Sequence, residues 1–328
     1  MFQEFASSFK LYELIFGGND IFPGKIIISP DKLYFPAEAL ITNKKESTTY
    51  LIETHPVSYA HSAQLLMIDF NSNATTDVKD FLGLAPVNFR NHIPSLIGSD
   101  ASLEKVTSAL RDSKTLTFTN ASKNNFTQQF PFYSIVQLYT HASDNKKAGE
   151  PEVFFADSIL YLSELINERK PSTKLIVLSA CETATGNWQR GEGVYSFNRG
   201  FASLGIPSTI TNLWSVDNVS TYRLTELFYK HLAQNESIDV ALQNAKLEFI
   251  KSSSKEKSLP YFWAATILSG KTDAIKFKQQ YISKSLYWSV GLGCCFLLLG
   301  YLFWNARQQT KRLSLERITT SAVHSNQE

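Results

Sequence analysis

The chain has 328 residues, of which 43% are hydrophobic and 19% are charged, and its formal net charge is +2. This length suits one large domain or two small ones, and a near-neutral charge without a Lys/Arg block gives no indication of a nucleic-acid partner. Three cysteines in a chain of this size exclude a disulfide framework. The six histidines and three cysteines show no metal-ligand spacing, so we expect neither a metal nor a cofactor.

The N-terminal residues 1–24 are expected to form a helical lead-in. Aromatic and apolar side chains recur through this stretch from Phe2 to Ile15, and Gly17 and Gly18 end the pattern. Charged and polar residues interrupt it, so it lacks the apolar core of a secretory signal.

Strands and helices alternate in the apolar pattern from residue 25 to residue 270. Strands are predicted at 25–29, 81–85, 133–140, 174–181, 208–213 and 261–268. Helices are predicted at 102–110, 155–167, 193–204, 219–233 and 237–250, with Gly205 as the residue that ends the third of these. This alternation predicts an α/β fold of three layers, with helices on both faces of a mostly parallel sheet.

Two of the predicted strands end at residues with chemically reactive side chains. The strand from Tyr133 runs directly into His141, and the strand from Lys174 ends at Cys181. In a parallel α/β sheet, sites lie beyond the carboxyl ends of the strands, so both side chains are expected at one edge. The pattern suggests a Cys–His protease dyad. The alternative is that Cys181 is an inert strand-end thiol and His141 a loop histidine with structural partners.

An uncharged segment near the C-terminal end predicts a transmembrane helix. Leu286 to Trp304 is 19 residues long, which as a helix spans about 28 Å, close to the ~30 Å hydrocarbon core. Aromatic residues lie at both of its ends, as in the aromatic belts of membrane helices. The alternative is a buried core helix. Residues 271–285 are then a juxtamembrane linker and residues 305–328 a polar tail.

The charges that flank this segment do not decide its orientation. Four lysines precede it and four Lys/Arg residues follow it, so the positive-inside rule favours neither direction. The missing secretory signal, together with one thiol outside the apolar segment, favours a single-pass membrane protein with a cytoplasmic globular part.

Ordered blocks of sequence between residues 25 and 270 resemble the CHAT domain, a bacterial branch of the caspase and separase group of cysteine proteases. The most specific block is Leu178–Thr183, which contains Cys181 and is followed by Gly191–Gly193. The other matching blocks are Ile28–Leu40, Tyr50–Glu53, Val57–Ala60, Leu82–Val87, Asn212–Asp217 and Tyr261–Leu268. The resemblance implies a caspase-like three-layer sandwich.

The resemblance also implies the chemistry of acyl transfer. Cys181 would attack a peptide carbonyl as a thiolate, and His141 would act as general acid–base. The backbone N–H groups of Cys181 and Ala142 would stabilise the oxyanion. The expected partner is a protein substrate, in a bacterial stress or defence pathway. An upstream or separate sensor or repeat partner is a further possibility.

Two departures from the family pattern leave an alternative open. Ala142 stands where the family has glycine, and Asn218 stands where it has a second aspartate. If position 142 needs a positive φ, alanine adopts it at a cost of roughly 1 kcal/mol or more. The alternative reading is therefore a catalytically weakened module that serves as a membrane-tethered scaffold. A thiol hydrolase or acyltransferase other than a protease is a third reading.

Asp217 has two possible roles. A carboxylate after a strand at the same sheet edge would favour substrates with a basic P1 residue. The same side chain is suited to cap the helix that begins near Val219.

Overall fold

The computed structural model describes most of the chain up to residue 277 and a few residues beyond it. The described residues are 2–17, 21–30, 34–43, 49–60, 62–67, 78–108, 110, 112–145, 150–166, 170–179, 188–189, 193–194, 197–277, 297–302, 304–305 and 307. Cys181 lies outside them. The chain divides into two compact units, Met1–Lys278 and Gln279–Glu328.

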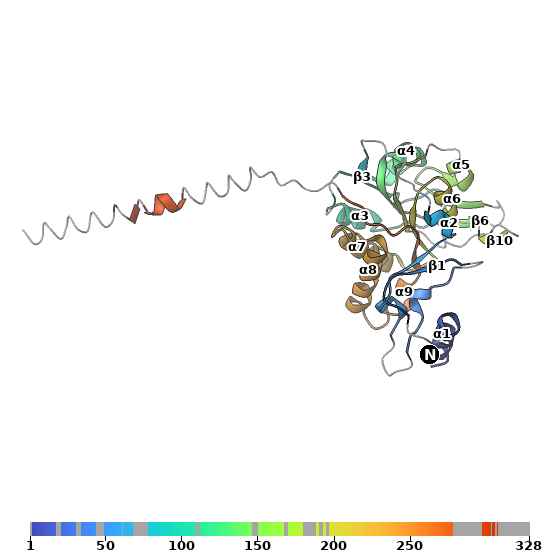
Figure 1. Ribbon diagram of the computed structural model, residues 1–328. Helices are drawn as coiled ribbons and strands as arrows, with labels where there is room; N and C mark the ends of the chain where they lie inside the picture. The colour runs from blue at the N-terminus through green and yellow to red at the C-terminus, as the bar shows by residue number, and fades with distance from the viewer. Residues whose placement is uncertain are drawn as a thin grey trace, which may run out of the picture. The chain divides into compact units, whose positions relative to one another are not determined.

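An eight-stranded sheet forms the centre of the first unit (Figure 1). Its strands, in spatial order, are β1 (Ile26–Ile28), β2 (Val57–Tyr59), β13 (Thr266–Gly270), β12 (Ser208–Asn212), β9 (Leu175–Ser179), β5 (Tyr133–Tyr139), β3 (Lys79–Ala85) and β4 (Ser113–Thr117). The pairing of β12 with β13 is antiparallel, and the other described pairings in this sheet are parallel. The predicted mostly parallel sheet is confirmed.

Helices cover both faces of the sheet (Figure 1). One face carries α3 (Ser99–Ser108), α7 (Asn218–Leu232) and α8 (Ile238–Ser252), and the other carries α4 (Lys123–Gln129), α5 (Leu162–Ile166) and α6 (Phe197–Ser203). Alternate residues of β5 face the two layers: Ile135 and Tyr139 pack toward α7, whereas Val136 and Leu138 pack toward α6. Burial on both faces explains why the central strands are almost continuously apolar.

Shorter elements complete the first unit. Three of them, β6, β7 and β8, form a separate antiparallel sheet that begins directly after His141. The shorter elements are α1 (Phe2–Phe16), η1 (Ala37–Ala39), η2 (Leu51–Glu53), α2 (Ala63–Met67), η3 (Phe118–Asn120), η4 (Phe130–Phe132), β6 (Ala142–Asn145), β7 (Glu150–Phe154), β8 (Ile159–Tyr161), β10 (Trp188–Gln189), β11 (Gly193–Val194) and α9 (Pro260–Trp263).

Two of the predicted elements are wrong in kind. The helix predicted at 155–167 is a turn followed by β8 and the short α5, because the N–H of Phe155 bonds to the carbonyl of Ser158 at 2.8 Å and closes a tight turn. The strand predicted at 261–268 begins as α9, since Pro260 occupies the first helical position, where its missing N–H is harmless. The chain becomes extended only at Thr266.

The predicted membrane segment 286–304 lies mostly outside the described residues. Of this segment the structure describes residues 297–302 and 304, which are helical. Within the described part of the chain, none of the helices combines the length and apolar character that crossing a membrane requires.

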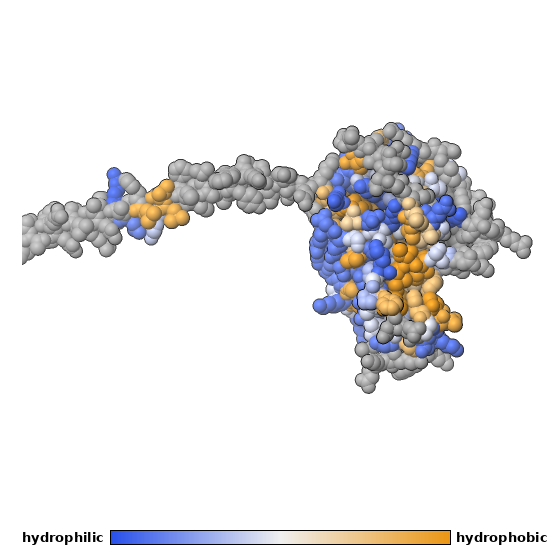
Figure 2. Space-filling model, viewed as in Figure 1, coloured by the Kyte–Doolittle hydropathy of each residue, from blue (hydrophilic) through white to orange (hydrophobic). Residues whose placement is uncertain are grey.

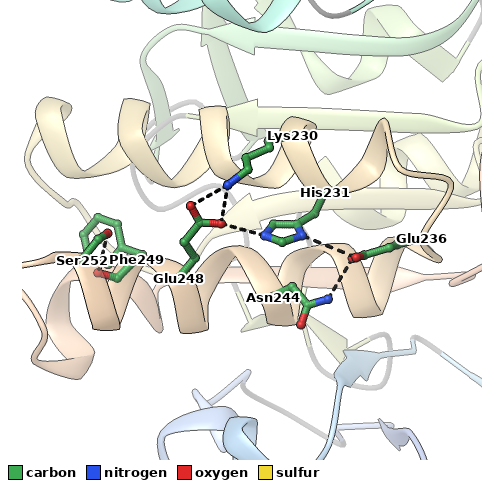
Figure 3. Close-up of polar contacts among 7 residues, drawn as sticks. All are labelled: Lys230, His231, Glu236, Asn244, Glu248, Phe249 and Ser252. Atoms are coloured by element: carbon green, nitrogen blue, oxygen red, sulfur yellow. Dashed lines mark hydrogen bonds and ion pairs between the residues drawn. The ribbon is translucent and has the colours of Figure 1, made fainter.

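Polar side chains join α7 to α8 along their outer edge (Figure 3). Lys230 donates to both carboxylate oxygens of Glu248 at 2.7 and 2.9 Å, and His231 Nε2 lies 3.0 Å from the same carboxylate. These contacts from Lys230 and His231 hold the pKa of Glu248 below its usual range. Because these side chains are partly exposed, their ion pairs are expected to contribute little to the free energy of unfolding.

A largely apolar groove lies between α1, η1 and the start of α9. It has a volume of about 530 Å³, and Leu11, Phe35, Tyr50 and Leu259 are among its lining residues. Figure 2 shows the apolar surface that gathers over this region of the molecule.

A buried ion pair joins the N-terminal part of the fold to α8. Lys246 Nζ lies 2.6 Å from Glu38 Oε2, and both side chains are at most 1% exposed. The same ammonium donates to the carbonyl of Thr266 in β13 at 2.5 Å. Burial raises the pKa of Glu38 and lowers the pKa of Lys246, and the charge of each partner opposes the shift of the other. Each group therefore depends on the other for its charged form.

Lys246→Met is expected to lower the free energy of unfolding by about 3–5 kcal/mol, because it leaves the Glu38 carboxylate buried without its partner. Combining Glu38→Leu with Lys246→Met should recover most of this loss. Urea denaturation measures both changes. The control is Lys230→Met, which removes an exposed ion pair and should change stability by less than about 1 kcal/mol. Equal losses in Lys246→Met and the control would contradict the assignment.

Candidate active site

The parallel pairing of β5 with β9 places the ends of these two strands side by side. In the register of the pair, Tyr139 lies opposite Ser179, and the N–H of Thr140 reaches the carbonyl of Ser179 at 3.4 Å. His141 directly follows Thr140, and Cys181 is the second residue after Ser179 in the sequence. The expected positions of the strands before both residues are therefore confirmed. The approach of Cys181 to His141 stays a prediction, since Cys181 lies outside the described residues.

His141 is held by a backbone carbonyl on its Nε2 side. Its Nε2 lies 2.8 Å from the carbonyl oxygen of Pro94, and the ring of Phe89 meets the imidazole edge to face at 4.9 Å. A carbonyl oxygen only accepts, so Nε2 carries the proton when the ring is neutral. Nδ1 then holds the lone pair. This is the arrangement of a base that is oriented by a third group.

The loop that delivers the Pro94 carbonyl has an unusual backbone. Val87, Asn91 and His92 adopt φ values of 62°, 58° and 58°. A positive φ is common enough for asparagine and histidine but exceptional for a β-branched residue such as Val87. The N–H of Leu96 bonds to the carbonyl of Val87 at 2.8 Å, which closes the loop over the strained residue. Backbone strain of this kind collects at functional sites, where the surrounding structure enforces it.

Pro94 and Phe89 were not identified from the sequence. The contribution of Pro94 is a main-chain oxygen, and every residue has one, so no residue type could mark it. Only the position of the loop over β5 reveals the contact.

Ala142 adopts a conformation that alanine accepts without strain. It is the first residue of β6 and pairs with Val153 of β7, while the N–H of Phe154 bonds to the carbonyl of His141 at 3.0 Å. The hydroxyl of Thr140 also donates to the carbonyl of Phe154. Among the described non-glycine residues with positive φ, Ala142 does not occur. The strain considered for alanine at this position is therefore absent, and its role as an oxyanion donor stays a prediction.

Asp217 caps helix α7. Its Oδ1 accepts from the N–H of Ser220 at 3.1 Å and lies 3.4 Å from Lys257 Nζ. Partial burial raises the pKa of Asp217, but the hydrogen bonds from Ser220 and the charge of Lys257 outweigh it and hold the pKa below its usual range. The capping role is thus seen directly. Contact of Asp217 with a substrate remains a prediction. The next residue, Asn218, is exposed and occupies the first position of α7.

An aromatic pair fixes the segment between β12 and α7. Trp214 Nε1 donates to the carbonyl of Tyr261 at 3.0 Å, and the Tyr261 hydroxyl donates to the carbonyl of Ser215 at 2.9 Å. These contacts tie the segment that bears Asp217 to α9. Within the part of the chain that the structure covers, no group of three or more His, Cys, Asp or Glu side chains is arranged to hold a metal ion.

The fold is that of a mixed α/β protein with a mostly parallel central sheet. The CHAT domain model matches residues 11–271, and the chain belongs to the CHAT domain family. This confirms the resemblance read from the sequence. No curated protein matches the chain.

Similar solved structures include the separase–securin complex of Saccharomyces cerevisiae, the Arg-specific cysteine proteinase gingipain R of Porphyromonas gingivalis and caspase-1 of Spodoptera frugiperda. Their sequence identities are 12%, 10% and 14%, with TM-scores of 0.49, 0.48 and 0.38. The matches cover 74%, 77% and 64% of this chain. They cover 15%, 63% and 95% of the matched chains, so this chain spans only a small part of the first.

The hydrogen bond to Pro94 predicts the tautomer of His141. At a pH where the ring is neutral, long-range ¹H–¹⁵N NMR spectra should show the proton on Nε2, because the carbonyl oxygen stabilises only that form. His92, an exposed residue of the same loop, is the control and should show a mixture of tautomers. A proton on Nδ1 of His141 would contradict the assigned contact.

Proposed function

We propose that this protein is a cysteine endopeptidase in which Cys181 is the nucleophile and His141 the general acid–base. The observation that carries the proposal is the parallel register of β5 and β9, which ends with Tyr139 opposite Ser179. If the segments that follow the two strands continue in this direction, His141 and Cys181 meet beyond the sheet edge. Membership of the CHAT family supports the same assignment.

The proposed reaction begins with the transfer of the Cys181 proton to His141. The thiolate sulfur forms a bond to the carbonyl carbon of the substrate, and negative charge moves to the carbonyl oxygen. The N–H groups of Cys181 and Ala142 would bind this oxygen, and each such donor is often worth ~3 kcal/mol in the transition state. The C–N bond then breaks as His141 protonates the leaving amine.

Water completes the proposed cycle. His141 takes a proton from the water as it attacks the thioester carbon, and the C–S bond breaks. The carboxylic acid leaves, and the proton returns to the sulfur. The contact between Nε2 and Pro94 supports Nδ1 as the atom that exchanges these protons, since the carbonyl oxygen already engages Nε2.

The proposal is tested by N-terminomics of cells that express the wild-type chain or Cys181→Ala. New N-termini should appear with the wild type only, and His141→Ala should reduce cleavage by about 10²–10⁴-fold, the usual contribution of a general acid–base. Replacing Cys294 and Cys295 by alanine is the control and should leave cleavage unchanged.

Fractionation of the same cells tests the membrane anchor that we propose at residues 286–304. Deletion of residues 286–328 should move the protein to the soluble fraction.

Cleavage that persists in Cys181→Ala would overturn the assignment of the nucleophile. Absence of cleavage by the wild type, together with a Cys181 thiol no more reactive than free cysteine, would favour the alternative of a scaffold. The proposed place of the activity in a stress or defence pathway rests on the family resemblance, and the identities of the cleaved proteins test it.

We further propose that Asp217 receives a basic P1 side chain, which would replace Lys257 beside the carboxylate. Its exposure and its position after β12 support this role. Asp217→Asn keeps a good helix cap but removes the charge. We expect it to lower kcat/KM for peptides with Arg or Lys at P1 by about 10-fold or more, as the loss of a hydrogen bond to a charged group does.

Peptides with an apolar P1 residue serve as the internal control and should be cleaved by Asp217→Asn as by the wild type. Lys257→Met should raise kcat/KM for basic P1 residues, since it removes the competing ammonium. Equal effects of Asp217→Asn on basic and apolar peptides would show that Asp217 acts only as the cap of α7.

A further inference from the structure

Gln137 places a buried amide between the two strands that lead to His141 and Cys181. It lies on β5 four residues before His141, and its side chain is fully buried. Its Nε2 donates to Ser179 Oγ at 2.9 Å, and its Oε1 accepts from the Tyr229 hydroxyl of α7 at 3.1 Å. One side chain therefore connects β5, the last residue of β9 and α7.

Ser179 is held from a second side by α7. Its Oγ lies 3.4 Å from Thr225 Oγ1, and the Thr225 hydroxyl donates to the carbonyl of Thr221 at 2.9 Å. A cavity of about 10 Å³ lies against Ser179, Thr221 and Thr225, which is about the smallest space that admits one water molecule. The end of β9 is thus fixed by side chains as well as by the sheet.

Polar side chains are an unusual choice for this layer. The neighbouring positions on the same face of the sheet, Ile135, Leu175, Val177 and Ile210, are apolar and buried. An apolar residue at position 137 would fill the space without the desolvation of an amide, so packing alone does not account for Gln137. Buried polar contacts whose partners are all in place hold their groups in one arrangement. Here these contacts fix Ser179, the last residue of β9, which precedes Cys181 by two positions in the sequence.

We propose that Gln137 is a positioning residue that holds the end of β9 at the place from which Cys181 reaches His141. This inference rests on the proposed function. Gln137 itself does not touch the substrate. It acts through Ser179, and Tyr229 orients the amide so that its N–H₂ group points to the Ser179 hydroxyl.

The test uses the full chain with Cys294 and Cys295 replaced by alanine, so that alkylation by iodoacetamide reports Cys181 alone. Gln137→Leu should lower kcat by about 10²-fold with KM unchanged, since a displacement of about 1 Å at the reacting atoms has an effect of that size. The pH dependence of alkylation should move toward that of an ordinary cysteine, because the thiol loses its contact with His141. Ser179→Ala should have the same effects, whereas Ser179→Thr keeps the hydroxyl and should retain activity.

Two further comparisons separate positioning from stability. The double variant Gln137→Leu/Ser179→Ala should be no slower than either single variant, as expected for residues that act through one contact. The matched control is Thr173→Val, which removes a buried hydrogen bond of 2.7 Å to the carbonyl of Phe130 just before β9 begins. It should lower the melting temperature without changing kcat or the alkylation profile. Tyr229→Phe removes one bond of the same amide and tests the proposal should Gln137→Leu fail to fold.

One outcome would overturn the positioning role while the proposed function stands. In it, Gln137→Leu and Tyr229→Phe lower the melting temperature but leave kcat and the alkylation profile unchanged, as expected of Thr173→Val. Failure of the proposed function has a different signature. The parent chain itself would then cleave no peptide and its Cys181 would be alkylated like free cysteine, and both proposals would fall together.

Discussion

Parallel pairing of β5 with β9 is the contact on which the rest of the site depends. Parallel strands end at the same edge of a sheet, so Thr140, which follows β5, lies beside Ser179, the last residue of β9. The same pairing puts Gln137 beside the end of β9 and brings Ser179 under α7. A shift of one residue in this register would turn Gln137 toward the opposite helix layer and separate it from Ser179 and Tyr229.

The histidine side of the site is held mainly by main-chain groups. The Pro94 carbonyl engages the imidazole, and the short sheet that begins at Ala142 fixes the chain directly after it. The loop that carries Pro94 accepts a positive φ at Val87, an arrangement that costs energy and that the buried surroundings of Val87 enforce. The end of β9, in contrast, is held by side chains, since Gln137 and Thr225 both contact the Ser179 hydroxyl. The two halves of the candidate site are therefore supported by different kinds of contact.

The three strands at one end of the sheet, β1, β2 and β13, are joined to the rest of the first unit by one strand pairing and by a buried ion pair. The antiparallel pairing of β12 with β13 links the block formed by β1, β2 and β13 to the remaining strands. The buried pair of Glu38 and Lys246 links η1 to α8, and the bond of Lys246 to Thr266 extends that link to β13. Asp217 lies near the same seam, after β12, where it caps α7 and contacts Lys257. Its charge is thus already partly compensated before any ligand binds.

Sequence periodicity was sufficient for the elements that are buried on both faces or clearly amphipathic. The central strands, α7 with its apolar face of Leu224, Leu227 and Phe228, and the turn at Gly205 were all predicted, and Gly205 has a φ of 88°. It failed at 155–167 and 261–268, where a tight turn and Pro260 override the apolar pattern. Local patterns report what each segment buries, and they do not report what a neighbouring segment donates to it.

The sequence by itself determined that two strands precede His141 and Cys181, that they belong to a mostly parallel α/β sheet, and that the blocks around them resemble the CHAT family. Only the tertiary structure decided the order of the strands, the contact of Pro94 with His141 and the partnership of Gln137 with Ser179 and Tyr229. It also decided that Ala142 needs no positive φ and that Asp217 already has Lys257 beside it. The physical reason is that these contacts join residues distant in sequence, 47 positions apart for Pro94 and His141 and 92 for Gln137 and Tyr229, through groups whose partners no local pattern specifies.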